Sequence, residues 1–153
     1  MKHRPQIVAF MTPFPYSIDI DAPLSEARAF MQRRRIRHLP VTSKGTVVGL
    51  ITDRDIKLVL GPDFAYPPEK ELKVRDVCVE DPYIVPASTP VAVVAGTMAK
   101  RHIGSAIITK KEKLAGIFTS TDACRALAKL LGPTDAGGPG SRRLMRQTRT
   151  NRL

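Results

Sequence analysis

The stretch Gly49-Leu50-Ile51-Thr52-Asp53-Arg54-Asp55 decides the fold, because the chain contains it twice. The second copy is Gly116-Ile117-Phe118-Thr119-Ser120-Thr121-Asp122. Each copy predicts an apolar strand that ends in a hydroxyl residue, with a carboxylate three positions later at the start of an amphipathic helix. The copies are offset by 67 residues, and the same offset relates Pro23 to Pro90. One supersecondary unit used twice predicts a closed pair of units about a pseudo-twofold axis.

Turn residues and apolar periodicity predict the elements of the first unit. Residues 17–20 alternate as a short strand, and Asp21 caps a helix that has Pro23 in its first turn. Residues 39–51 form a hairpin, and a second helix follows and stops at Gly61. The unit is therefore strand, helix, strand, strand, helix.

The second unit repeats this order. Ser88-Thr89-Pro90 predicts the capped start of its first helix, and Gly132 ends its last helix. The predicted fold class is α/β (α+β), with two β-α-β-β-α repeats whose small sheets pack together and whose helices lie outside. The predicted boundaries are 5–60 for the first repeat, 61–73 for a linker, 74–132 for the second repeat and 133–153 for a basic, flexible tail.

The chain is strongly basic, with a net charge of +11. Residues 133–153 hold five arginines against one aspartate, so they carry +4 and the rest of the chain carries +7. A basic balance favours anionic partners such as nucleotides, nucleic acid or acidic membrane, without selecting among them. One hypothesis is therefore a nucleic-acid-associated protein that uses the basic body and tail.

Several classes of protein find no support in the sequence. No apolar run approaches 18 residues and no secretory signal is visible, so we expect no membrane span. Cys78 and Cys124 lie outside any CxxC pattern, which fits a reducing compartment and a cytoplasmic location. His3, His38 and His102 stand at no metal-ligand spacing, and no catalytic dyad or triad is recognisable. We expect neither a metal site nor enzymatic activity.

The motifs of each unit resemble a known family. A helix, then Ile36-Arg37-His38-Leu39-Pro40-Val41, then a hairpin that ends in Gly49-Leu50-Ile51-Thr52-x-x-Asp55 resembles a CBS domain, named after cystathionine β-synthase. Two copies in tandem resemble the CBS pair, or Bateman module, over about residues 5–131. The resemblance implies a two-layer fold with two clefts between the repeats. In many members one or both clefts hold an adenine nucleotide or S-adenosylmethionine as a regulatory ligand.

The resemblance further implies a regulatory module that requires no cofactor, forms a homodimer through its helices and controls an unidentified protein partner. It also implies the residues of the first cleft. Asp55 would accept hydrogen bonds from ribose hydroxyls beside Thr52 and Arg54, and Arg37 and His38 would lie at phosphate positions. The adenine wall would come from the second repeat, through Tyr83, Ile84, Gly104, Ser105 and Ala106.

In the second cleft, Thr119, Thr121 and Asp122 would take the corresponding places. The phosphate positions there are Gly104 and Ser105, which carry no charge, so a single occupied cleft is expected to be the Asp55 cleft. The wall of the second cleft would be made by Ser17, Ile18, Ile36, Arg37 and His38.

Two alternatives to ligand binding stay open. Thr52 with Asp55, and Thr119 with Asp122, also fit a plain helix-capping box, in which threonine is the N-cap and an acidic residue is three positions later. Capping and ligand contact can coexist at one carboxylate. The chain could otherwise be a structural dimerisation module with empty clefts.

Overall fold

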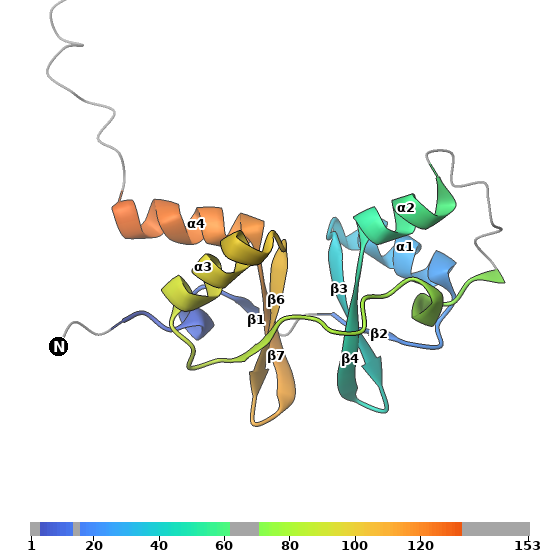
Figure 1. Ribbon diagram of the computed structural model, residues 1–153, viewed down its shortest axis with the longest axis horizontal. Helices are drawn as coiled ribbons and strands as arrows, with labels where there is room; N and C mark the ends of the chain where they lie inside the picture. The colour runs from blue at the N-terminus through green and yellow to red at the C-terminus, as the bar shows by residue number, and fades with distance from the viewer. Residues whose placement is uncertain (1–3, 14–15, 62–70, 133–153) are drawn as a thin grey trace, which may run out of the picture.

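The computed structural model describes residues 4–13, 16–61 and 71–132 (Figure 1). Its helices and strands follow the predicted order twice, so the predicted fold class is confirmed. The predicted tail and residues 62–70 of the predicted linker lie outside the described residues. The first unit contains β2 (Ile18–Asp19), α1 (Leu24–Arg34), β3 (His38–Ser43), β4 (Thr46–Thr52) and α2 (Asp53–Leu60). The second contains β5 (Ile84–Pro86), α3 (Val91–Arg101), β6 (Ser105–Lys110), β7 (Lys113–Thr119) and α4 (Ser120–Leu131).

Two small sheets lie at the centre of the molecule. One has the strand order β2-β3-β4, and the other has the order β1 (Thr12–Pro13)-β7-β6-β5. The two hairpins share one register, since His38 lies opposite Thr52 and Ser105 lies opposite Thr119. β4 and β7 contact each other across the seam between the units. Figure 1 shows the hairpin turns at one end of the molecule and α2 and α4 at the other.

The second unit is completed by the N-terminal segment of the chain. η1 (Ile7–Ala9) and β1 come before the first unit in sequence, yet both pack on the second unit. Ile7 is fully buried in the second core, and its N–H donates to the Thr89 carbonyl at 2.7 Å. In β1, Thr12 pairs with Ile117 of β7. Residues 5–13, which sequence order alone assigns to the first repeat, therefore contribute to the second core.

The first unit is completed in the same way by the segment between the repeats. Val74, in η3 (Val74–Asp76), is fully buried in the first core. Leu50 and Val79 exchange two backbone hydrogen bonds of 3.0 and 2.8 Å. Each unit is thus completed by a segment of about nine residues that precedes the other unit in the chain. Residues 5–13 pack on the second unit and residues 72–80 pack on the first, and we call these two stretches the borrowed segments.

The glycine that opens each copy of the repeated motif makes room for the borrowed segment. A Cβ on Gly116 would lie 2.7 Å from the Thr12 carbonyl oxygen and would overlap Met11 Sδ. A Cβ on Gly49 would lie 2.7 Å from the Val79 carbonyl oxygen. Real Cβ atoms do not approach carbonyl oxygens this closely, so any side chain at either position would push the segment away.

The starts of α1 and α3 differ from the predicted caps. Their N-cap residues are Pro23 and Pro90, and neither makes a side-chain capping bond. The prediction that Asp21 caps α1 is therefore wrong, as is the prediction of a Ser88-Thr89 cap. The Asp21 carboxylate instead accepts hydrogen bonds from the Arg75 guanidinium, and this pairing lowers the pKa of Asp21.

The physical reason is that backbone carbonyls replace the side-chain caps. The first N–H of α1, from Leu24, donates to the Leu72 carbonyl at 2.9 Å. The first N–H of α3, from Val91, donates to the Pro5 carbonyl at the same distance. Leu72 and Pro5 both belong to borrowed segments, so the exchange satisfies amides that a helix start otherwise leaves unpaired.

Candidate functional site

Two equivalent sites lie where β4 and β7 end and α2 and α4 begin. In the first, Asp55 Oδ2 accepts from the Thr52 N–H at 2.9 Å and from the Thr52 hydroxyl at 2.6 Å, while the Asp55 N–H donates back to Thr52 Oγ1 at 3.1 Å. Thr119 and Asp122 form the same capping box. The capping interpretation is therefore confirmed at both sites. It uses one oxygen of each carboxylate and leaves the other for a different partner.

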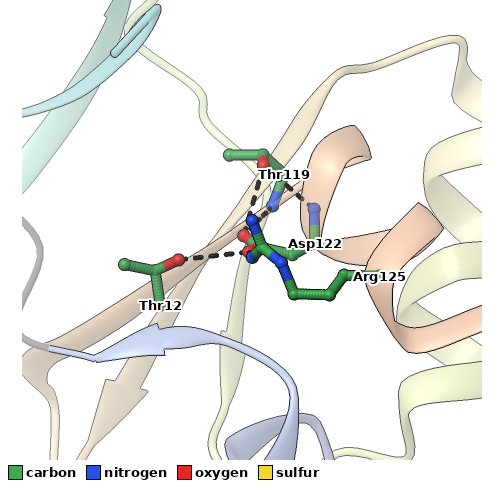
Figure 2. A network of polar contacts seen from close by, with 4 residues as sticks. All are labelled: Thr12, Thr119, Asp122 and Arg125. Atoms are coloured by element: carbon green, nitrogen blue, oxygen red, sulfur yellow. Dashed lines mark hydrogen bonds and ion pairs between the residues drawn. The ribbon is translucent and has the colours of Figure 1, made fainter. Parts of the chain in front are cut away.

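The remaining oxygen distinguishes the two sites. Asp122 Oδ1 accepts from the Thr12 hydroxyl at 3.1 Å and from Arg125 Nη1 at 2.8 Å (Figure 2). Asp122 is only 3 % exposed, so its carboxylate is buried and both oxygens are engaged. Asp55 is half-buried, and its Oδ1 has no hydrogen-bond partner among the described residues. Of the two sites as the described residues form them, the first keeps one carboxylate oxygen without a partner.

The asymmetry has a simple origin in the sequence. The 67-residue offset makes Val79 equivalent to Thr12 and Leu58 equivalent to Arg125. Val79 and Leu58 have no side-chain donor, so neither side chain can engage Asp55. Sequence reasoning missed Thr12 and Arg125 as members of the second site. The signal that could have found Thr12 is the departure from the repeat at position 12.

We expect Thr12→Val to lower the free energy of unfolding by about 1–3 kcal/mol, because the buried Asp122 carboxylate loses a donor. The matched change is Val79→Thr at the equivalent, exposed position, which should alter stability by no more than about 0.5 kcal/mol. Urea denaturation of the two variants measures the difference. Equal stability of both variants would show that the Thr12–Asp122 bond contributes nothing.

His38 joins the first site to the second unit. Its Nε2 lies 3.0 Å from where a Cβ on Gly104 would stand, so the imidazole packs against bare backbone across the seam. Burial lowers the pKa of His38 below its ordinary value of 6.5, and the positive charge of Arg37 lowers it further, while the negative charge of Asp55 opposes both. The imidazole is therefore neutral at pH 7 and can donate one N–H.

This lowered pKa predicts a dependence of stability on pH. Below about pH 6.5 the unfolded chain binds a proton at His38 that the folded chain resists, so the free energy of unfolding falls as the pH decreases from 7.5 to 5.5. We expect His38→Gln to reduce this loss, as measured by urea denaturation across the pH series. His102→Gln, at the exposed end of α3, is the control. The same pH slope in both variants would contradict the prediction.

Ser105 takes the place of His38 in the second unit, since the repeat offset relates the two positions. Ser105 is buried, and its Oγ has no hydrogen-bond partner among the described residues. No imidazole therefore faces the Asp122 site from β6.

Of the other residues predicted for the first cleft, some are exposed and others pack in the second core. Arg37, Arg54 and Ile84 are exposed. Tyr83 packs against the second core beneath the Arg101 guanidinium, which lies 5.3 Å from the ring centroid. Ala106 is fully buried in that core, so it can offer a ligand only its backbone.

The residues predicted for the second cleft likewise include both exposed residues and residues of the first core. Ser17 and Thr121 are exposed, whereas Ile18 is buried in the first core and Ile36 packs against it. The structure brings together Thr52, Asp55, His38 and Gly104 at the seam. Within the described residues, no helix is long and apolar enough to cross a membrane.

Comparison with known proteins gives consistent matches. The model of the CBS domain family matches residues 7–61 and 74–129. A CBS domain-containing protein of Dictyostelium discoideum is 28% identical over 127 residues, which cover 77% of this chain and 88% of that protein. Inosine-5'-monophosphate dehydrogenase of Thermoplasma acidophilum is 28% identical over 108 residues, or 70% of this chain, but the chain spans only 20% of that enzyme.

Solved structures share the fold. The CBS domain pair of protein MJ0100, in complex with 5-methylthioadenosine and S-adenosyl-L-methionine, has a TM-score of 0.72 at 22% identity, covering 82% of this chain and 97% of that one. CBSX2 in complex with AMP has a TM-score of 0.72 at 21% identity, covering 83% and 98%.

Proposed function

This chain belongs to the CBS domain family, and from that premise we propose that it is a non-catalytic regulatory module that binds one adenosine-containing ligand in the cleft built on Asp55. The observation that carries the proposal is the unengaged Oδ1 of Asp55, set against the fully engaged carboxylate of Asp122. A ribose presents two neighbouring hydroxyl donors, which suit a carboxylate acceptor.

The surroundings of Asp55 fit the rest of such a ligand. Neutral His38 supplies an N–H donor beside the seam, and Arg37 and Arg54 supply exposed guanidinium groups that suit a phosphate or a carboxylate. The two solved relatives hold AMP in one case and 5-methylthioadenosine with S-adenosyl-L-methionine in the other, and adenosine is common to all three compounds. We therefore propose the adenosine part as the element recognised, and leave its 5' substituent to the test.

The test is a thermal-shift panel of AMP, ADP, ATP, S-adenosylmethionine and GMP. A ligand that binds only the folded chain stabilises it by about 2.7 kcal/mol at a concentration 100 times its dissociation constant. We expect a dose-dependent rise in melting temperature with at least one adenosine compound, and titration calorimetry should give one site per chain. If no adenosine compound shifts the transition, the proposal fails; two equivalent sites would refute the restriction to the Asp55 cleft.

Regulation requires more than binding. A ligand shifts an equilibrium between two arrangements only if it binds one of them more tightly. The seam is the natural place for such a preference, because His38 of one unit packs on Gly104 of the other. We propose that ligand binding changes the geometry of the dimer or the activity of a protein partner, and that the protein acts in the cytoplasm, where its two free cysteines would stay reduced.

We also propose that the protein forms a homodimer through α3 and α4. Leu127, Leu130 and Leu131 of α4 are 59%, 57% and 75% exposed, and Val93 of α3 is 48% exposed. Exposed apolar side chains gathered on neighbouring helices are typical of interfaces.

We expect Leu127→Asp combined with Leu131→Asp to give monomers in light scattering after size-exclusion chromatography. Two charges placed in an apolar interface would be left desolvated and unpaired. Val8→Asp, at an exposed apolar position outside helices α1, α2, α3 and α4, is the control and should leave the dimer intact. An unchanged mass in the double variant would exclude this face as the interface.

A further inference from the structure

A cavity lies on the second unit, at the hairpin end of β6 and β7. It has a volume of about 460 Å³, within the range of small-molecule sites. The hairpin end of β6 and β7 forms one side, and the borrowed N-terminal segment forms the other. Its lining residues are Val8, Met11, Pro13, Ala87, Lys110, Lys111, Lys113, Leu114 and Ala115.

Three exposed lysines gather at the hairpin end of this cavity. Lys110 and Lys113 lie directly opposite each other at the end of the hairpin, and Lys111 follows in the turn. Like charges opposite each other on paired strands destabilise the pair. Within the described residues none of the three makes an ion pair, and Glu112 is the single acidic residue of the turn. An anion held between these ammonium groups would relieve the repulsion.

The first unit supplies an internal comparison. At the equivalent hairpin end, Ser43 lies opposite Thr46, so the charged pair is replaced by hydroxyl side chains that do not repel each other. Only the turn lysine is shared, because Lys44 is equivalent to Lys111. Both turn lysines have the same positive φ of 50°. The lysine cluster is therefore specific to the second unit and does not follow from hairpin geometry.

The remaining wall is apolar. Val8 is 45% exposed although it belongs to the buried segment around Ile7, and Met11 and Leu114 are half-buried beside it. Met11 is held in place because its sulfur packs over Gly116. The cavity thus combines an apolar floor with three ammonium groups at one edge.

We propose that this cavity binds a small organic acid, namely a carboxylate carried on an apolar alkyl or aryl body. The carboxylate would lie between Lys110 and Lys113, and the apolar body would cover Val8, Met11 and Leu114. The site is separate from the proposed adenosine site, since Lys110 lies at the opposite end of β6 from Ser105 of the predicted adenine wall, about 17 Å along the strand. Figure 1 shows these hairpin turns on the side away from α2 and α4.

The test is calorimetric titration of the full chain with decanoate below its micellar concentration, beside acetate and decanol. We expect decanoate to bind, and acetate and decanol to bind at least tenfold more weakly. Acetate lacks the long alkyl chain, and decanol lacks the carboxylate. Lys110→Gln with Lys113→Gln should weaken decanoate binding by about tenfold or more. The charge-matched control, Lys44→Gln with Lys100→Gln, should leave it unchanged. Decanoate should also shift the NMR signal of the Met11 methyl group.

Several results would overturn the proposal. Equal weakening in the control pair would mean that decanoate responds only to the net positive charge. Equal binding of decanol or acetate would remove the need for a combined site, and an unshifted Met11 methyl would place the ligand elsewhere. Binding that appears only with micelles or anionic vesicles would indicate a membrane surface instead. Asp55→Asn should not affect decanoate binding, so failure of this proposal and failure of the adenosine proposal can be told apart.

Discussion

Asp55→Asn should weaken the binding of the adenosine ligand by about 100-fold or more. The asparagine keeps one carbonyl oxygen for the bonds that Asp55 Oδ2 accepts from Thr52, so the start of α2 is preserved. It replaces the free anionic oxygen by an amide, and hydrogen bonds to a charged acceptor are worth about 1.5–3 kcal/mol each. Two ribose hydroxyls losing that acceptor account for the expected factor. Titration calorimetry with the best compound of the panel measures it.

The control is Asp122→Asn, the same change at the equivalent position of the second unit. It should lower stability, because it disturbs a buried carboxylate that holds Thr12 and Arg125, but it should leave the affinity for the ligand within about twofold of the original. Measurements below the melting temperature of both variants keep folding and binding apart. The reverse pattern, with binding lost in Asp122→Asn and kept in Asp55→Asn, would move the site to the other cleft.

The sequence was sufficient to predict the fold because the signals are local. Gly61 and Gly132 end α2 and α4 as predicted, and both have positive φ. The Thr-x-x-Asp capping boxes formed as their spacing predicts. A repeat also identifies equivalent positions without any structure, which is how Val79 can be compared with Thr12.

The exchange of segments could not be predicted in this way. Residues 5–13 and 72–80 are equivalent in the repeat, so the repeat pattern alone does not tell on which unit each segment packs. The predictions of side-chain caps for α1 and α3 were wrong for the same reason. The first N–H groups of α3 and α1 donate to the carbonyls of Pro5 and Leu72, which come from distant parts of the chain. The hydrogen bond from Thr12 to Asp122 depends on this exchange, so the departure from the repeat at position 12 could mark Thr12 as unusual without identifying its partner.

Gly116→Ala should lower the free energy of unfolding by about 1–3 kcal/mol, which is the usual cost of forcing atoms into a filled space. The new Cβ would stand 2.7 Å from the Thr12 carbonyl oxygen, and a backbone atom cannot turn aside as a flexible side chain can. Gly49→Ala should cost a similar amount, since its Cβ would meet the Val79 carbonyl oxygen at the same distance. Urea denaturation of both variants measures these costs.

The matched control, Gly96→Ala, should have the opposite sign. Gly96 lies in α3, and a Cβ added there would have nothing within 4 Å, so alanine should stabilise the helix by about 0.5–1 kcal/mol. A Gly116→Ala variant as stable as Gly96→Ala would mean that residues 11–12 do not lie over β7 as described. If instead the segment lifts away while the rest stays folded, Asp122 loses the Thr12 hydroxyl but keeps Arg125 Nη1, which lies 2.8 Å from its Oδ1. Stability and the stoichiometry of adenosine binding, measured on this variant, therefore test whether Thr12 is needed beside Arg125 to keep Asp122 from a ligand.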